Sequence, residues 1–190
     1  MPYKEEHTAD SDSIALALDI GGTWTRAAAV SRDGRILASA KARTISDVDH
    51  GTVIDTCVRI IRAVVDDAQP VRGLGVSATG PIDPSTGVLF TPPFTGSGLA
   101  GLRLAPLLAQ ALGIPVVADR DTNAAELAEQ RYGAARGCAD FVYVTVSTGV
   151  GGAVFTNGQL LRGADGVAGE IGHVVVRMGG ELCGCGRSGC

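Results

Sequence analysis

The sequence contains no apolar run long enough to cross a membrane, and residues 1–13 are polar without an apolar signal core. A membrane-spanning helix needs about 20 apolar residues, and a secretory signal needs an apolar segment of its own. Basic charge is also scarce, because 16 Lys and Arg face 20 Asp and Glu, a net charge of −4. We therefore expect a cytoplasmic protein with neither a membrane nor nucleic acid as its partner. Residues 1–13 are predicted to be a disordered tail, too short for a helix-turn-helix domain.

Cysteine is sparse and unevenly placed, with five residues among 190. Cys57 falls on the apolar face of a predicted helix and is expected in the core. Cys138 is isolated, whereas Cys183, Cys185 and Cys190 crowd the end of the sequence. Without a secretory signal, such a trio indicates a metal site before disulfides. The length of 190 residues allows one domain or two small ones.

Residues 14–37 predict two strands joined by a glycine turn, then a tight turn and a third strand. The predicted pieces are the strands Ile14–Asp19 and Thr25–Val30, the glycine turn Gly21-Gly22-Thr23, and a type I′ hairpin turn at Asp33-Gly34. Glycine can take positive φ, so backbone N–H groups can face an anion at close range, and Thr23 adds a hydroxyl donor. Asp19 ends the first strand beside this turn, where a carboxylate suits a hydrated Mg²⁺.

Residues 141–161 repeat this plan. An apolar strand ends at Ser147-Thr148-Gly149, a Gly151-Gly152 turn follows, and Asn157-Gly158 forms the second tight turn. Either copy alone is more simply an ordinary hairpin, since glycine-rich motifs match by chance. Two copies in the same order favour two like domains that hold the phosphates of one nucleotide between them.

The remaining pattern alternates helices with buried strands, which is typical of an α/β fold. It predicts helices at 47–69, 106–112 and 123–135, strands at 72–78, 88–90, 114–118 and 174–177, and an N-cap at Asp47 or Asp49. The strand 72–78 ends in Thr79-Gly80-Pro81, at the edge where open α/β sheets bind ligands. We place a domain boundary near residue 117, between an N-terminal α/β domain (14–117) and the first part of a C-terminal α/β domain (118–190).

The acidic turn at residues 119–123 contains the candidate base. Asp121 lies where a strand ends and a helix begins, and its carboxylate can accept the proton of a hydroxyl that attacks a γ-phosphate. Aspartate is also a favoured N-cap, so helix capping alone accounts for it as well. Asp119 is a rival that spacing does not separate from Asp121. Further along, Glu170 and His173 form a polar pair in which Glu170 suits sugar hydroxyls, or is a solvated loop carboxylate.

His173 and the three clustered cysteines offer one imidazole and three thiolates, which is a usual tetrahedral zinc shell. The proposed ligands are His173, Cys183, Cys185 and Cys190. Four protein ligands close the coordination shell, so the zinc is expected to be structural rather than catalytic. A redox-reactive or loosely exposed cysteine trio is the alternative.

Five motifs occur in one order from about Ile14 to Cys190: Asp19-Ile-Gly-Gly-Thr23, Asp121-Thr-Asn123, Ser147-Thr-Gly-Val-Gly-Gly152, Ala168-Gly-Glu-Ile-Gly-His173 and Cys183-Gly-Cys-Gly-Arg-Ser-Gly-Cys190. Together they resemble the ROK family of sugar kinases and sugar-responsive repressors. The resemblance implies an actin-like, ribonuclease-H-like two-domain fold that closes around ATP with Mg²⁺ and a hexose, and phosphorylation of a sugar hydroxyl. It also implies that the full-length protein is a homodimer.

By motif position, Asp121 resembles the family's base, the two glycine turns its phosphate loops, and His173 both a sugar contact and a zinc ligand. The candidate sugar contacts are Thr79, Gly80, Arg120, Glu170 and His173. Arg120 stands where glucokinase-like members carry asparagine, and Pro93 lies where they often carry another. Arg120 is therefore expected to pair with Asp119 or to bind a different hydroxyl pattern.

We expect the chain to be the N-terminal portion of a longer kinase, because the second domain has less material than the first. One alternative is a non-catalytic sugar-sensing module of the repressor branch. Another is a truncated chain without activity.

Overall fold

The computed structural model describes residues 13–45, 48–66, 69–90, 99–147 and 149–190. Their elements are β1 (Ile14–Ile20), β2 (Trp24–Val30), β3 (Ile36–Arg43), α1 (His50–Arg62), β4 (Val71–Ala78), β5 (Ile82–Asp83), β6 (Val88–Leu89), α2 (Leu104–Leu112), β7 (Val116–Arg120), α3 (Asp121–Tyr132), β8 (Phe141–Val146), β9 (Val150–Thr156) and β10 (Gln159–Leu160). The predicted tail 1–13 lies outside the described residues except for Ser13. Among the described residues, no helix has the length and apolar character needed to cross a membrane.

The first part of the chain forms a five-stranded mixed sheet in the order β3-β2-β1-β4-β7. β1 pairs antiparallel with β2 and parallel with β4, which in turn pairs parallel with β7. Asp19, Ser77 and Asp119 occupy matching register positions on the three parallel strands. The carboxyl ends of β1, β4 and β7 therefore meet at one edge, and polar residues follow each of them.

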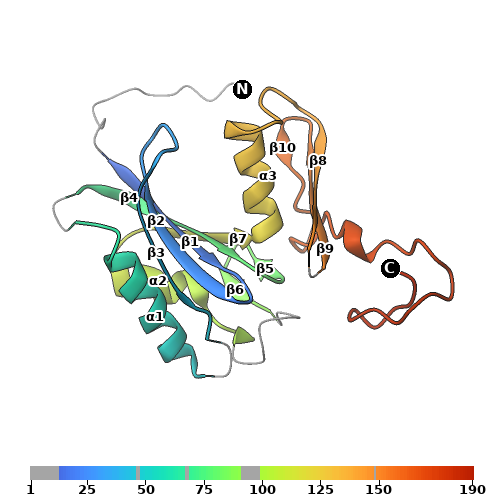
Figure 1. Cartoon of the computed structure of the whole chain (residues 1–190), viewed down its shortest axis with the longest axis horizontal. Coiled ribbons are helices and arrows are strands. Elements are labelled where there is room, and N and C mark those ends of the chain that lie inside the picture. The colour runs from blue at the N-terminus through green and yellow to red at the C-terminus, as the bar shows by residue number, and fades with distance from the viewer. Residues whose placement is uncertain (1–12, 46–47, 67–68, 91–98, 148) are drawn as a thin grey trace.

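Helices α1 and α2 lie together on one side of this sheet, while α3 and β8–β10 lie on the other (Figure 1). The apolar face of α1 is buried, including Cys57, whose pKa burial raises to about 12. Cys57 is thus a core residue, as predicted. The side chain of Asp49 accepts a hydrogen bond from the backbone N–H of Thr52 (3.0 Å), so Asp49 is the N-cap. The helix is shorter than predicted and ends at Arg62.

The second helix begins at Leu104, two residues before the predicted start at Pro106. It ends at Gly113, which has a left-handed φ of 69° and donates its backbone N–H to Ala109 O. This confirms the predicted stop at Gly113. Two short strands, β5 and β6, pair with each other after β4. The sequence predicted only the second of these, at 88–90, and β5 was missed.

The two tight turns differ in type. Asn157 and Gly158 both have positive φ (52° and 76°), as a type I′ turn requires. Asp33 does not, since Asn157 is the single non-glycine residue with positive φ in the described part of the chain. The Gly34 N–H donates to Ser31 O (3.0 Å), and within this turn only Gly34 has a positive φ. The predicted I′ turn at Asp33-Gly34 is therefore wrong. A longer turn ends in Gly34, and the β2–β3 register shifts beside it.

The second part of the chain packs α3 against a three-stranded antiparallel sheet in the order β10-β9-β8. Its small core contains Ala153, Phe155 and Leu160, and the rings of Phe141 and Phe155 stack at 5.1 Å. The predicted strand at 174–177 is wrong, because the described chain there forms a bend beyond a short 3₁₀ turn at Ile171–His173. β7 crosses the boundary predicted near residue 117 and belongs to the five-stranded sheet.

Helix α3 carries an acidic side chain, Glu126, in an apolar buried position. Glu126 is fully buried between α3 and the β8–β9 sheet, and no described donor makes a hydrogen bond of good geometry to its carboxylate. Burial raises the pKa of this carboxyl above its ordinary value of 4.5. The backbone of Tyr143 and Phe155 lies close enough to lower its pKa, but burial has the larger effect. A buried charge without a partner destabilises the folded state, because the unfolded chain keeps that charge hydrated.

Replacing Glu126 with leucine is expected to stabilise the protein at pH 7 by about 1–3 kcal/mol. The folded pKa lies above the unfolded one, so this group favours folding below pH 4.5, and that contribution is lost as pH rises through the folded pKa. Urea unfolding between pH 4 and 8 should show a falling stability in wild type that Glu126→Gln and Glu126→Leu both flatten. Glu129→Gln is the control, since the Glu129 carboxylate accepts the Ala134 N–H (2.8 Å). A wild-type profile with no such decline would contradict this account.

Candidate functional site

The first predicted phosphate turn is held by the end of β3. The backbone N–H of Gly21 donates to Trp24 O (3.1 Å), and the Thr44 hydroxyl donates to Gly21 O (2.7 Å). The backbone N–H of Thr44 also donates to Thr23 O (3.0 Å). Gly22 and Thr23 are exposed at the tip of the turn. Sequence reasoning missed Thr44, since nothing local to β3 marks a residue that contacts Gly21, 23 residues earlier in the chain.

Asp19 lies beside this turn and is half-exposed. Its carboxylate accepts a hydrogen bond from the Ser77 hydroxyl (3.2 Å) and pairs with the Arg26 guanidinium (2.9 Å). The Arg26 partner follows from the β1–β2 register, in which Asp19 and Arg26 are direct neighbours. Asp19 is therefore a fixed carboxylate at the strand edge rather than a freely mobile one.

Thr79 connects the first turn to the candidate base. Its backbone N–H donates to Ile20 O (3.1 Å), and its hydroxyl donates to the Asp121 carboxylate (3.3 Å). Gly80 follows with a φ of 101°, a conformation that favours glycine. The structure thus brings the loop after β4 and the start of α3 together at one edge of the sheet.

The structure separates the two rival aspartates. The Asp119 carboxylate accepts from the Arg120 N–H (2.8 Å) and the Asn123 amide (2.7 Å), and it pairs with Arg162 (2.7 Å). Asp119 therefore ties β7, α3 and the loop at Arg162 together.

Asp121 is placed differently. It is the first residue of α3, with Arg120 as the N-cap residue, so Asp121 is not itself the cap. Its carboxylate accepts from the Thr122 N–H (2.8 Å) and the Thr79 hydroxyl (3.3 Å). Among the described residues these contacts come from uncharged donors, whereas Asp119 is paired with a cation.

The second predicted glycine motif forms a turn only around Ser147 and Gly149. The predicted Gly151-Gly152 turn is wrong, because both glycines lie within β9. The Ser147 N–H donates to Gly149 O (2.9 Å), which closes the turn. A Cβ on Gly151 would lie 3.0 Å from the Thr122 methyl group, so Gly151 sits directly against the residue after Asp121. A Cβ on Gly152 would lie 2.8 Å from the backbone oxygen of Tyr143, which cannot move away as a side chain can, so this position favours glycine. The predicted residue Thr148 lies outside the described residues.

Glu170 and His173 lie on the loop that follows β10. Glu170 pairs with the Arg120 guanidinium, and its second oxygen lies 3.8 Å from His173 Nε2. Arg120 itself is buried, and its guanidinium does not contact the Asp119 side chain as one prediction had it. Only its backbone N–H does so. Glu170 is therefore a paired carboxylate and not a freely solvated one.

The predicted metal ligands come together in the C-terminal loop. The ligand atoms of His173, Cys183, Cys185 and Cys190 all lie within 4.8 Å of one another. Cys183 Sγ is 3.6 Å from His173 Nδ1, and Cys185 Sγ is 3.6 Å from Cys190 Sγ. A tetrahedral zinc ion with ordinary bond lengths separates such atoms by about 3.5–3.8 Å. A hydrogen bond from the Arg187 backbone lowers the pKa of Cys185 to about 6, which favours its thiolate form.

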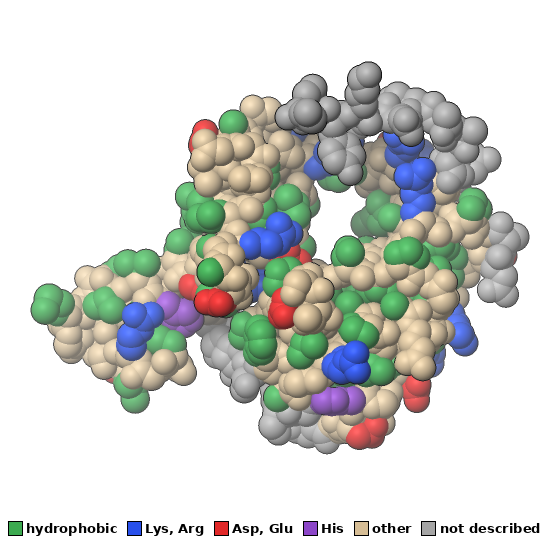
Figure 2. Space-filling view, turned by 180° about the vertical axis from the view of Figure 1, so that it is seen from behind, with side chains coloured by type: hydrophobic (Ala, Val, Ile, Leu, Met, Phe, Trp, Pro, Cys, Tyr) green, Lys and Arg blue, Asp and Glu red, His purple; other side chains and the backbone are tan. Residues whose placement is uncertain are grey.

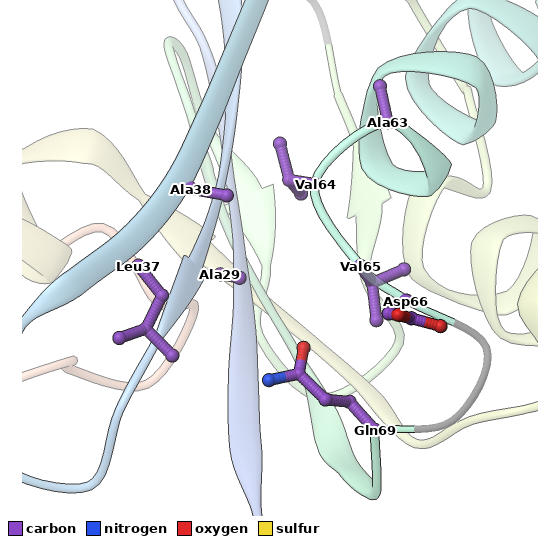
Figure 3. A pocket seen from close by; sticks show the side chains of 8 residues that line it. All are labelled: Ala29, Leu37, Ala38, Ala63, Val64, Val65, Asp66 and Gln69. Atoms are coloured by element: carbon purple, nitrogen blue, oxygen red, sulfur yellow. The ribbon is translucent and has the colours of Figure 1, made fainter.

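This C-terminal loop stands away from the body of the molecule, with a histidine at its base (Figure 2). A groove of about 510 Å³ lies elsewhere, at the opposite end of β2 and β3 from the glycine turn (Figure 3). It is lined mainly by small or apolar residues, among them Ala29, Leu37 and Val65. None of the predicted site residues lines this groove, so it does not belong to the candidate site.

The residues of this site come from the five sequence motifs. The sequence model of the ROK family matches residues 15–190. The chain belongs to the ROK family. This confirms the resemblance that the motifs carry.

Relatives in the ROK family include sugar kinases. The chain is 37% identical over 178 residues to the glucokinase of Thermotoga maritima, covering 92% of this chain and 55% of that protein. It is 38% identical over 176 residues to the N-acetylmannosamine kinase of Escherichia coli, covering 92% of this chain and 58% of that protein. The chain thus spans little more than half the length of these relatives.

A solved ROK structure shows the same fold. The ROK family glucokinase of Streptomyces griseus, in complex with glucose and AMPPNP, superposes with a TM-score of 0.81 at 34% identity. The match covers 93% of this chain and 55% of that one. The predicted α/β, actin-like fold is therefore confirmed, with this chain covering about half of it.

Proposed function

We propose that this ROK chain is part of an ATP-dependent sugar kinase that transfers a γ-phosphoryl group to a hexose hydroxyl, with Asp121 as the base. The observation that carries the proposal is the difference between the two aspartates. Asp121 stands at the strand edge with only hydroxyl and N–H donors, while Asp119 is neutralised by Arg162. A carboxylate that is held in place but not paired with a cation keeps its capacity to accept a proton from a substrate hydroxyl.

In this proposal the two glycine turns hold the phosphates of ATP through backbone N–H groups. The residues concerned are Gly21, Gly22, Thr23, Ser147, Thr148, Gly149, Gly151 and Gly152. Asp19 would hold Mg²⁺ through water, and its fixed position beside Ser77 and Arg26 suits that role. Bound Mg²⁺ would neutralise charge on the phosphates during transfer. Phosphoryl transfer then depends mainly on positioning and charge stabilisation.

The sugar would lie between Thr79 and Gly80 on one side and Glu170 and His173 on the other. The Thr79 hydroxyl donates to the Asp121 carboxylate. Glu170 pairs with Arg120, which precedes Asp121 in the chain. The relatives are named for glucose and N-acetylmannosamine, so we propose a hexose or N-acetylhexosamine as the substrate.

We further propose that His173, Cys183, Cys185 and Cys190 hold a structural zinc ion. Two ligand pairs are 3.6 Å apart, which is the spacing of a tetrahedral zinc shell, and all four ligand atoms lie within 4.8 Å of one another. Four protein ligands leave no open position. The zinc would fix the orientation of His173 and with it the loop that presents Glu170.

A coupled assay of ADP release by the full-length protein, across hexoses and N-acetylhexosamines, tests the proposed activity. We expect turnover that depends on both Mg²⁺ and one or a few of these sugars. Sugar binding by calorimetry without any turnover would instead support the sugar-sensing alternative. Neither binding nor turnover with any sugar would contradict the proposal.

A further inference from the structure

The junction between the five-stranded sheet and the second part of the chain contains a buried cation. Arg120 is the last residue of β7, and its side chain is only 4% exposed. One Nη pairs with Glu170, and the other donates to Ala168 O (2.6 Å) and reaches Asn123 Oδ1 at 3.3 Å. The guanidinium therefore connects β7 and α3 to two positions of one loop, 48 and 50 residues further along the chain.

That loop is pressed against β9 on its other side. Gly169 has a φ of 84°, and a Cβ there would lie 2.9 Å from the Ala153 backbone. A Cβ on Gly172 would lie 2.0 Å from Val150 O. The glycines give the loop its path along β9, but they bring no side chain that would fix Glu170. Among the described residues, Arg120 and His173 are the side chains that contact the Glu170 carboxylate.

Direct contact between Arg120 and a sugar does not suit this geometry. Both Nη groups already hold protein acceptors, and the side chain is removed from solvent. Glu170, by contrast, is 46% exposed and keeps an oxygen that Arg120 does not occupy. The guanidinium fork is suited to this task because it donates to two acceptors in one plane, which a lysine ammonium does not do in a fixed geometry.

We infer that Arg120 is a positioning residue, which locks the 168–170 loop and presents Glu170 to the sugar across the junction from Asp121. The effect on sugar binding rests on the proposed sugar kinase function, whereas the contact between Arg120 and Glu170 does not. Because Arg120 adjoins Asp121 in the chain, it fixes the distance between the proposed base and the proposed sugar contact. In this account Arg120 does not contact the sugar itself, as first predicted, but acts by holding Glu170, which does.

Steady-state kinetics of the full-length protein test this role. Arg120→Gln is expected to raise the sugar KM about tenfold or more, as expected for the loss of a charged hydrogen bond, with kcat and the ATP KM within about threefold of wild type. Arg120→Lys should restore part of the loss. Arg162→Gln is the matched control, because it removes a cation from Asp119 without touching Glu170. A fall in kcat with an unchanged sugar KM, or an equal effect of Arg162→Gln, would overturn the inference.

A second measurement does not depend on activity. Hydrogen exchange followed by mass spectrometry, without sugar, should show exchange of the 166–173 peptide faster by about tenfold in Arg120→Gln and unchanged in Arg59→Gln, which removes a basic side chain from the last turn of α1. On a Glu170→Gln background, Arg120→Gln should add much less. Unchanged exchange in a folded Arg120→Gln protein, or in a folded Glu170→Gln protein should Arg120→Gln not fold, would refute the lock. Faster exchange in a protein that phosphorylates no sugar would refute the proposed function instead and leave the lock standing.

Discussion

Replacing Asp121 with asparagine is expected to lower the kcat of the full-length protein by about 10²–10⁴-fold, while the KM for sugar and for ATP stays within a few-fold of wild type. Asparagine keeps an oxygen that can accept from Thr122 N–H and the Thr79 hydroxyl, so the local contacts persist. What is lost is the carboxylate that accepts the proton of the attacking hydroxyl. The coupled ADP-release assay at saturating substrates measures the effect.

The same substitution at Asp119 provides the comparison. Asp119 holds Asn123, Arg120 and Arg162, so Asp119→Asn removes the ion pair and is expected to lower the unfolding temperature more than it lowers kcat. Asp121→Asn is expected to do the reverse. An Asp121→Asn protein with wild-type turnover would show that the base is another residue, and Asp119 would be the next one to test.

Local sequence patterns predicted the strands and turns that build this edge of the sheet. β1 and β4 lie within a residue of their predicted bounds, because alternation and short apolar runs between turn residues are local signals. The proximity of His173, Cys183, Cys185 and Cys190 was also predictable, since the cysteines and their glycine bends lie within one short loop. Gly113 was recognised as a helix stop from its residue type alone.

Contacts between distant segments were not predictable in this way. Arg120 and Glu170 are 50 residues apart, and no periodicity links the end of β7 to the loop after β10. The same holds for Thr44, which braces the turn at Gly21 from the end of β3. The burial of Glu126 was not predicted from the sequence either. On an amphipathic helix a glutamate is expected to face solvent, but packing of α3 on β8 and β9 buries it without a partner.

The last prediction concerns the metal cluster. The loop after His173 exposes several apolar side chains, including Val176, Met178 and Leu182, and so gains little from burial. Its observed contacts are hydrogen bonds such as Val176 N–H to Gly189 O (2.8 Å), to which the proposed zinc would add four bonds. Structural zinc sites of this type supply much of the folding free energy of the segment that they close. We therefore expect residues 174–190 to lose their structure when the ion is removed.

Cys183→Ser is expected to lower bound zinc from about one ion per chain to less than about a tenth. It should also make Arg177 and Arg187 rapidly cleavable by trypsin, because both lie within the loop. Cys138→Ser is the matched control, since Cys138 is an exposed free cysteine outside the cluster. Elemental analysis and timed proteolysis of the full-length protein check both effects. Wild-type protein purified with far less than one zinc per chain, yet with a protease-resistant loop, would show that the thiols and the imidazole pack without a metal. Cys183→Ser is also expected to raise the sugar KM, because His173 would no longer be fixed beside Glu170.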